Sequence, residues 1–198
     1  MPMFTKRELK GLLLSFVVLT LAFALIFEFP APSLPIIGMS ALAVGTGFVF
    51  HEMGHKLTAQ HYGYIAGFEM SKTGLALAII TPVLTLGHLV FAAPGAVVIN
   101  ESVHTYAAPA ESRRTQHLHI SIAGILVNLA LALLFFALSA LDGGLGDVWR
   151  LAAYINVLLA MFNLIPFGPL DGAKVLKLSP MAWAASFGLA FVLFYFIG

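Results

Sequence analysis

Apolar runs long enough to cross a lipid bilayer are the feature that most constrains the fold of this chain. A membrane-spanning helix needs about 20 consecutive, mostly apolar residues, and such runs recur along the whole sequence. Hydrophobic residues make up 60% of the chain and charged residues 10%, and the mean hydropathy is +0.97. These values lie outside the range of soluble globular domains. We therefore predict an all-α polytopic membrane protein.

Prolines, glycines and polar segments separate the apolar runs, and 198 residues leave room for five or six spans with short loops. The expected spans are 11–27, 36–62, 118–141, 149–165 and 181–197. The first follows a basic head of Lys6, Arg7 and Lys10 and is long for the apolar part of a signal peptide. We interpret it as a retained span rather than a cleaved signal.

The segment 63–99 does not fit a single continuous span. Its larger part, 73–99, is apolar enough to cross the membrane, but Pro82 and Pro94 interrupt it and its end is rich in β-branched residues. It either crosses as a sixth span or enters the membrane and returns on the same side. We expect a re-entrant or short β segment, and hence five crossings.

A histidine pair with metal-ligand spacing lies in the second apolar run. His51 and His55 are four residues apart and therefore share one face of a helix, where both rings can reach a single ion. Glu52 beside them can act on a water held by that ion. An ionisable group inside a span costs roughly 3 kcal/mol or more, which makes a chance grouping of three unlikely. The chain has no cysteine, so the donors suit one Zn²⁺ ion.

Asp171 is the candidate for a third ligand, because catalytic zinc usually keeps three protein ligands and one open position. It follows an apolar run at a break rich in proline and glycine, and irregular backbone at membrane depth implies a surrounding site. The basic N-terminus is expected in the cytoplasm. Counting crossings from there places Asp171 on the same membrane face as His51 only if 73–99 returns without crossing. The alternative is an ordinary interfacial acid beside Lys174.

Two asparagines in apolar runs have both a structural and a functional interpretation. Asn163 can donate a hydrogen bond to the oxyanion of a tetrahedral intermediate, or it can be a packing amide. Asn128 is explained at least as well by a hydrogen bond between helices. The other histidines are expected at loops or interfaces rather than at the ion: His61, His88, His104, His117 and His119.

The motif at 51–55 (HEMGH) and the motif at 163–172 (NLIPFGPLDG) together resemble the site-2 protease family of intramembrane zinc metalloproteases, in its minimal prokaryotic form. The similarity extends over about 43–177 and includes the FAAPGAVV stretch at 91–98. One position departs from the pattern, because Ile125 stands where many relatives have a kinking proline. We find no PDZ-like insertion and no nucleotide-binding domain.

The resemblance implies a role for each candidate residue. His51, His55 and Asp171 would bind one Zn²⁺, Glu52 would be general base and acid, and Asn163 would help to stabilise the intermediate. The positions assigned to substrate binding are Asn128, Pro94 and Gly95.

The expected function is hydrolysis of a peptide bond in or near a transmembrane segment of a substrate protein. The partners are that substrate and membrane lipid, with no nucleic acid, and the location is a prokaryotic cell membrane with the active site toward the cytoplasm. A helical substrate must be unwound, and an exposed strand edge at 63–70 or 93–99 can hold it by strand addition. The alternative is a non-proteolytic membrane zinc-binding protein or a metal-ion carrier. A carrier needs polar groups along a path, whereas the ionisable residues here lie at one depth.

Overall fold

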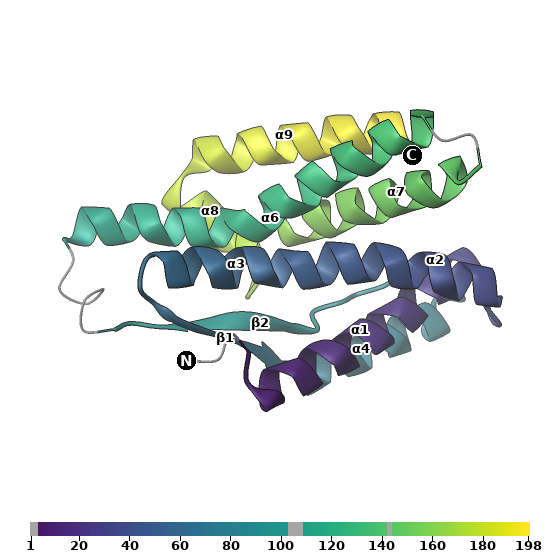
Figure 1. Cartoon of the computed structure of the whole chain (residues 1–198), viewed down its shortest axis with the longest axis horizontal. Helices are drawn as coiled ribbons and strands as arrows, with labels where there is room; N and C mark the ends of the chain where they lie inside the picture. Colours follow the sequence, from purple (N-terminus) through teal and green to yellow (C-terminus); the bar gives the residue numbers. More distant parts are fainter. Residues whose placement is uncertain (1–3, 103–108, 142–143) are drawn as a thin grey trace.

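The computed structural model describes residues 4–102, 109–141 and 144–198 of a mostly helical protein. A long central helix, formed by α2, η1 and α3, runs between two layers (Figure 1). Helices α6, α7, α8 and α9 lie on one side of it, and α1, α4 and the sheet of β1 and β2 lie on the other. The elements are α1 (Lys6–Phe27), α2 (Leu34–Val44), η1 (Gly45–Val49), α3 (Phe50–His61), β1 (Ile65–Met70), α4 (Lys72–Leu84), β2 (Gly95–Asn100), α6 (Ala110–Leu141), α7 (Gly146–Asn163), α8 (Asp171–Leu178) and α9 (Pro180–Ile197).

The first helix starts earlier than the predicted span 11–27, because its N-terminus is capped. The Thr5 side chain accepts a hydrogen bond from the Glu8 backbone N–H at 3.2 Å, and the Glu8 carboxylate accepts one from Thr5 N–H at 2.7 Å. This reciprocal pair satisfies backbone donors that a helix start leaves free. The basic residues before position 11 therefore belong to the first turns of α1.

The predicted span 36–62 is a continuous helix that contains one π-helical segment. The π segment η1 lies directly before the residues that carry the histidine pair. A π segment adds a residue to the helical turn and is often found at functional sites. At Gly47 in η1, an added Cβ would lie 2.7 Å from a methyl group of Leu159, so α7 packs closely against this segment.

The segment predicted to be re-entrant or β forms a helix and two strands. Helix α4 leads away from β1, the chain reverses at Leu86 and Gly87, and an extended stretch returns to β2 (Figure 1). The strands pair antiparallel from Ile65 opposite Asn100 to Met70 opposite Gly95. In the described part of the chain, β2 therefore has a partner strand on one side only.

Four of the described helices are long and apolar enough to cross a membrane: Lys6–Phe27, Leu34–His61, Ala110–Leu141 and Pro180–Ile197. The predicted span 149–165 corresponds to α7, which is 18 residues long but is not among the four. It carries Asp147, Arg150 and Asn156, which lower its hydropathy. Residues 142 and 143, between the predicted spans 118–141 and 149–165, lie outside the described residues.

The apolar core lies where α6 and α7 meet the central helix and α1. Leu19, Ile125 and Ile155 are fully buried there. Large apolar side chains also cover the outside of the helices, as at Leu133 of α6 and Phe196 of α9. Such an apolar exterior marks a surface in contact with lipid, and the protein is a membrane protein.

Candidate metal centre

Helix α3 directs the two histidine side chains to one point. His51 and His55 are 4% and 6% exposed, and their Nε2 atoms are 3.0 Å apart. Their rings meet edge to face, with an interplanar angle of 80°. The spacing of four residues accounts for this arrangement, because it places the rings one above the other on the helix.

Hydrogen bonds to the other ring nitrogens fix both imidazoles. Nδ1–H of His51 donates to Oδ1 of Asn128 at 2.6 Å, and Nδ1–H of His55 donates to the carbonyl oxygen of Ile120 at 2.6 Å. A ring that donates through Nδ1 keeps a lone pair on Nε2. Metal-binding histidines in proteins are usually held in this way, and both acceptors here come from α6.

The Asn128 amide is in turn oriented by two further hydrogen bonds. Its Nδ2 donates to the carbonyl oxygen of Gly47 at 3.0 Å and to Oδ1 of Asn156 at 3.1 Å. Nδ2 of Asn156 donates to the Ala152 carbonyl oxygen at 2.9 Å, which directs its Oδ1 toward Asn128. Both asparagines are fully buried. The chain of amides therefore leaves Oδ1 of Asn128 facing His51.

Asp171 reaches the histidines from the start of α8. Its Oδ2 lies 3.3 Å from Nε2 of His51 and 2.8 Å from Nε2 of His55. Its other oxygen, Oδ1, accepts a hydrogen bond from the Lys174 ammonium at 3.0 Å. The next residue is Gly172, where an added Cβ would lie 2.3 Å from the Leu164 carbonyl group. The glycine therefore allows the close approach of α8 to the end of α7 that brings Asp171 to the site.

The three donors fit a zinc ion. Their ligand atoms all lie within 4.8 Å of one another. In a tetrahedral zinc site with bonds of about 2.0–2.1 Å, ligand atoms are about 3.3 Å apart, close to the separations of 2.8–3.3 Å seen here. At Gly124 of α6, an added Cβ would lie 2.4 Å from Nε2 of His55. Helix α6 thus passes the donors without a side chain that would fill the site.

The part of the chain that the structure describes contains no second cluster of this kind. The other described histidines do not join the three donors: His61, His88, His117 and His119. His104 lies outside the described residues.

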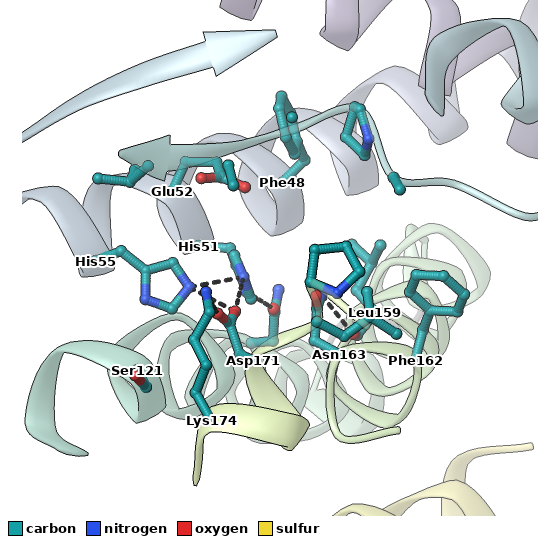
Figure 2. Close-up of a pocket in the computed structure, with 18 of the residues that line it drawn as sticks. Phe48, His51, Glu52, His55, Ser121, Leu159, Phe162, Asn163, Asp171 and Lys174 are labelled. Atoms are coloured by element: carbon teal, nitrogen blue, oxygen red, sulfur yellow. Dashed lines mark hydrogen bonds and ion pairs between the residues drawn. The ribbon is translucent and has the colours of Figure 1, made fainter. Parts of the chain in front are cut away.

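A cavity of about 320 Å³ opens beside the donors, and all eight residues selected from the sequence line it (Figure 2). Glu52 is 8% exposed, and its Oε2 is buried with no hydrogen-bond partner among the described residues. Val97 of β2 lines the same cavity. A buried carboxylate oxygen without a partner is rare in proteins, and next to three metal donors it is a natural place for a reactive water.

The remaining candidates lie on two walls of the cavity. Asn163 ends α7, and its Nδ2 donates to the Leu159 carbonyl oxygen at 3.0 Å. Pro94 and Gly95 lie on the other wall, at the start of β2. The Pro94 carbonyl oxygen accepts from the Ser71 backbone N–H at 2.9 Å. Asn128 lines the cavity as well, but its amide groups contact His51, Gly47 and Asn156.

Two contributors to the centre were not predicted from the sequence. Gly124 was given no role from the sequence, and its contact with the imidazoles was not predicted. Asn156 was not singled out, although a polar residue within an apolar helix is a usual sign of a contact between helices.

The comparisons with known proteins agree with this geometry. Peptidase family M50 matches residues 139–186, a range that includes Asn163 and Asp171. A protein of Methanocaldococcus jannaschii that is named as a zinc metalloprotease is 39% identical over 184 residues, which cover 91% of this chain and 89% of the relative. The chain belongs to peptidase family M50, the site-2 protease family.

A second relative of this site-2 protease is the zinc metalloprotease Rip2 of Mycobacterium tuberculosis. It is 32% identical over 169 residues, which cover 74% of this chain and 62% of Rip2. No solved structure matches the chain. The range matched by the M50 family covers α7 and α8 but not His51 and His55, so the geometry described above is what supports these two residues as candidate ligands.

Proposed function

We propose that this site-2 protease hydrolyses a peptide bond in or near a transmembrane segment of another protein. The observation that carries the proposal is the position of Glu52. Its Oε2 atom is buried without a hydrogen-bond partner among the described residues, and it lies at a cavity that also holds the His51, His55 and Asp171 donors. Helices with apolar exteriors surround this cavity. A substrate that reaches it from the bilayer is most simply a transmembrane segment.

Zinc held by the two histidines and Asp171 would polarise the scissile carbonyl and lower the pKa of a bound water toward neutrality. Glu52 would take the proton from the attacking water and return it to the leaving amine. Asn163 uses one Nδ2 hydrogen on Leu159 and has a second for the oxyanion. The Lys174 ammonium, bonded to Oδ1 of Asp171, keeps that carboxylate in place.

The outer edge of β2 is the best place to hold an unwound substrate. Phe68 of β1 and Val97 of β2 form a cross-strand pair, and the Phe68 N–H donates to Glu8 at the β1 edge. In antiparallel pairing the Val97 N–H then points to the opposite edge, where Val97 lines the cavity with Glu52. Helix α1 therefore covers the β1 edge, whereas the β2 edge faces the cavity. Of the two strands considered from the sequence, β2 is the one we propose for strand addition.

We propose five crossings, with 73–99 re-entrant and the metal centre toward the cytoplasm. The outward course of α4 and its extended return support the re-entrant segment, because both strands then lie at the same end of the molecule (Figure 1). The crossing count requires α7 to span the bilayer between α6 and α9, and it packs against both. The contact between Asp171 and the histidines agrees with this count.

Reconstituted protein and a single-span model substrate test the proposal. We expect cleavage that a zinc chelator abolishes and that added Zn²⁺ restores. Glu52→Gln should lower the cleavage rate by about 100-fold or more, because general acid–base catalysis is lost, while zinc content by mass spectrometry stays at one ion per chain. Glu111→Gln, which changes an exposed carboxylate, is the matched control. Stoichiometric zinc without chelator-sensitive cleavage would support a non-proteolytic zinc-binding protein or carrier instead.

A further inference from the structure

A buried ion pair links the first helix to the helix that carries the histidines. Glu8 of α1 is 7% exposed and Lys56 of α3 is 3% exposed, and the Lys56 ammonium contacts Oε1 of Glu8. Lysine and glutamate are almost never this buried unless they are paired. The proposed reaction uses neither residue, so catalysis does not account for their burial.

The Glu8 carboxylate joins three elements. Oε1 accepts from Lys56 on α3 and, at 3.1 Å, from the backbone N–H of Phe68 on β1, while Oε2 accepts from the Thr5 N–H at the start of α1. At Gly67, an added Cβ would lie 3.2 Å from Oε1, so the strand passes directly over the carboxylate. One side chain therefore fixes β1 against both helices.

Lys56 connects this junction to the metal centre. It directly follows His55 on α3, and its ammonium also lies 4.3 Å from the centre of the Phe4 ring. The turn of α3 that carries a metal-binding ring thus also carries the cation that holds Glu8. Movement of Glu8 relative to α3 would break the ion pair.

The two-stranded sheet connects this junction to the β2 edge, which is proposed to bind the substrate. Phe68, which Glu8 holds on the β1 side, pairs with Val97, and Val97 lines the cavity together with Glu52. We propose that Glu8 and Lys56 are positioning residues that hold the β2 edge at a fixed distance from Glu52. The role given to the β2 edge rests on the proposed function.

The double variant Glu8→Leu/Lys56→Met tests this role, because it removes the pair without leaving an unpaired buried charge. We expect a folded protein that binds zinc as the wild type does. KM for the model substrate should rise by about tenfold with kcat changed less than about twofold, since binding at the edge is lost rather than chemistry. Amide hydrogen exchange over 65–70, measured without substrate, should be at least about tenfold faster.

Matched controls separate positioning from charge. Lys10→Met/Glu69→Gln removes the same two charge types from α1 and β1 at exposed positions, and it should keep the wild-type KM and exchange rates. Lys56→Arg preserves the cation, and we expect its KM to stay close to that of the wild type. A merely stabilising pair would change thermal stability but neither KM nor local exchange.

The outcomes distinguish this inference from the proposed function. Wild-type protein that shows no chelator-sensitive cleavage counts against the proposed function, whereas the exchange experiment still tests whether the pair holds β1. Exchange over 65–70 in the double variant that equals the wild type overturns the positioning role. A wild-type KM in the double variant overturns it as well.

Discussion

A Cβ atom at Gly124 would lie 2.4 Å from Nε2 of His55, one of the atoms directed at the metal position. Nε2 of His51 would be 2.7 Å from the same Cβ. Helix α6 therefore contributes to the metal centre in two opposite ways. It provides hydrogen-bond acceptors for both imidazoles. At Gly124 it has no side chain, which leaves room for the two rings.

Gly124→Ala should therefore displace the imidazoles and weaken zinc binding. We expect the zinc affinity to fall by more than about 100-fold. This is a larger loss than the one expected when a single hydrogen bond to a metal ligand is removed. Competition with a fluorescent zinc chelator measures it. Gly188→Ala on α9 is the control, because no atom lies within 4 Å of the added Cβ. Wild-type zinc affinity in Gly124→Ala would contradict the packing of α6 against the rings.

Asn128→Leu removes the acceptor that orients His51. We expect zinc affinity to fall by roughly 10- to 100-fold, as is usual when the partner of a metal-binding histidine is lost. Asn128→Asp keeps an oxygen for Nδ1–H and should bind zinc more tightly than Asn128→Leu. Asn156→Leu acts only through Asn128 and should have a smaller effect than Asn128→Leu. The same chelator competition ranks the three variants, and equal affinities would show that the amides do not orient the ring.

Asp171→Ala tests the ligand that comes from the distant part of the chain. We expect zinc affinity to fall by more than about 100-fold, because a direct ligand contributes more than a hydrogen-bond partner of a ligand. Lys174→Met is the comparison, since it removes the contact to Oδ1 and leaves Oδ2, the oxygen near the histidines. It should retain stoichiometric zinc. Tight, stoichiometric zinc in Asp171→Ala would exclude it as a ligand.

Ile99→Pro tests strand addition at β2. Backbone N–H groups alternate along a strand, so Ile99, two residues from Val97, directs its N–H to the cavity edge and does not pair with β1. A proline on an edge strand removes an outward donor without breaking the ladder. KM should rise by about three- to tenfold, the value of one hydrogen bond. Zinc content should not change.

Ile99→Ala controls for the loss of the side chain, and its KM should lie closer to that of the wild type. Cleavage assays over a range of substrate concentrations separate KM from kcat. A KM for Ile99→Pro equal to that of Ile99→Ala would show that the substrate backbone does not pair with this edge.

The sequence predicted the metal-donor cluster because ionisable residues stand out in apolar helices. His51 and His55 are linked by helical spacing alone, and Asp171 was joined to them by counting membrane crossings. The strand tendency of 97–99 was also visible, and β2 contains it. The start of α1 was missed although Thr5 and Glu8 have the spacing of a capping box, a signal that was present in the sequence.

Contacts between distant segments could not be predicted in the same way. Gly124 lies beside His55 only because α6 packs against α3, and glycine is common in membrane helices simply because it lets two helices approach closely. The pairing of Glu8 with Lys56 spans 48 positions, and no local pattern links them. Helix α4 was not predicted as such, because the apolar residues and prolines of 73–99 left both a sixth span and a re-entrant or short β segment open.

The polar character of α7 has a consequence for how this protein enters the membrane. A helix that carries Asp147, Arg150 and Asn156 is costly to transfer into lipid alone. Asn156 meets its partner Asn128 on α6, so with the proposed five crossings the two helices would insert best together as a hairpin. Asp171 follows this hairpin in the chain. With the proposed ligand set, the nascent protein would lack a complete metal centre until α7 and α8 have docked, which would delay its proteolytic activity until insertion is nearly finished.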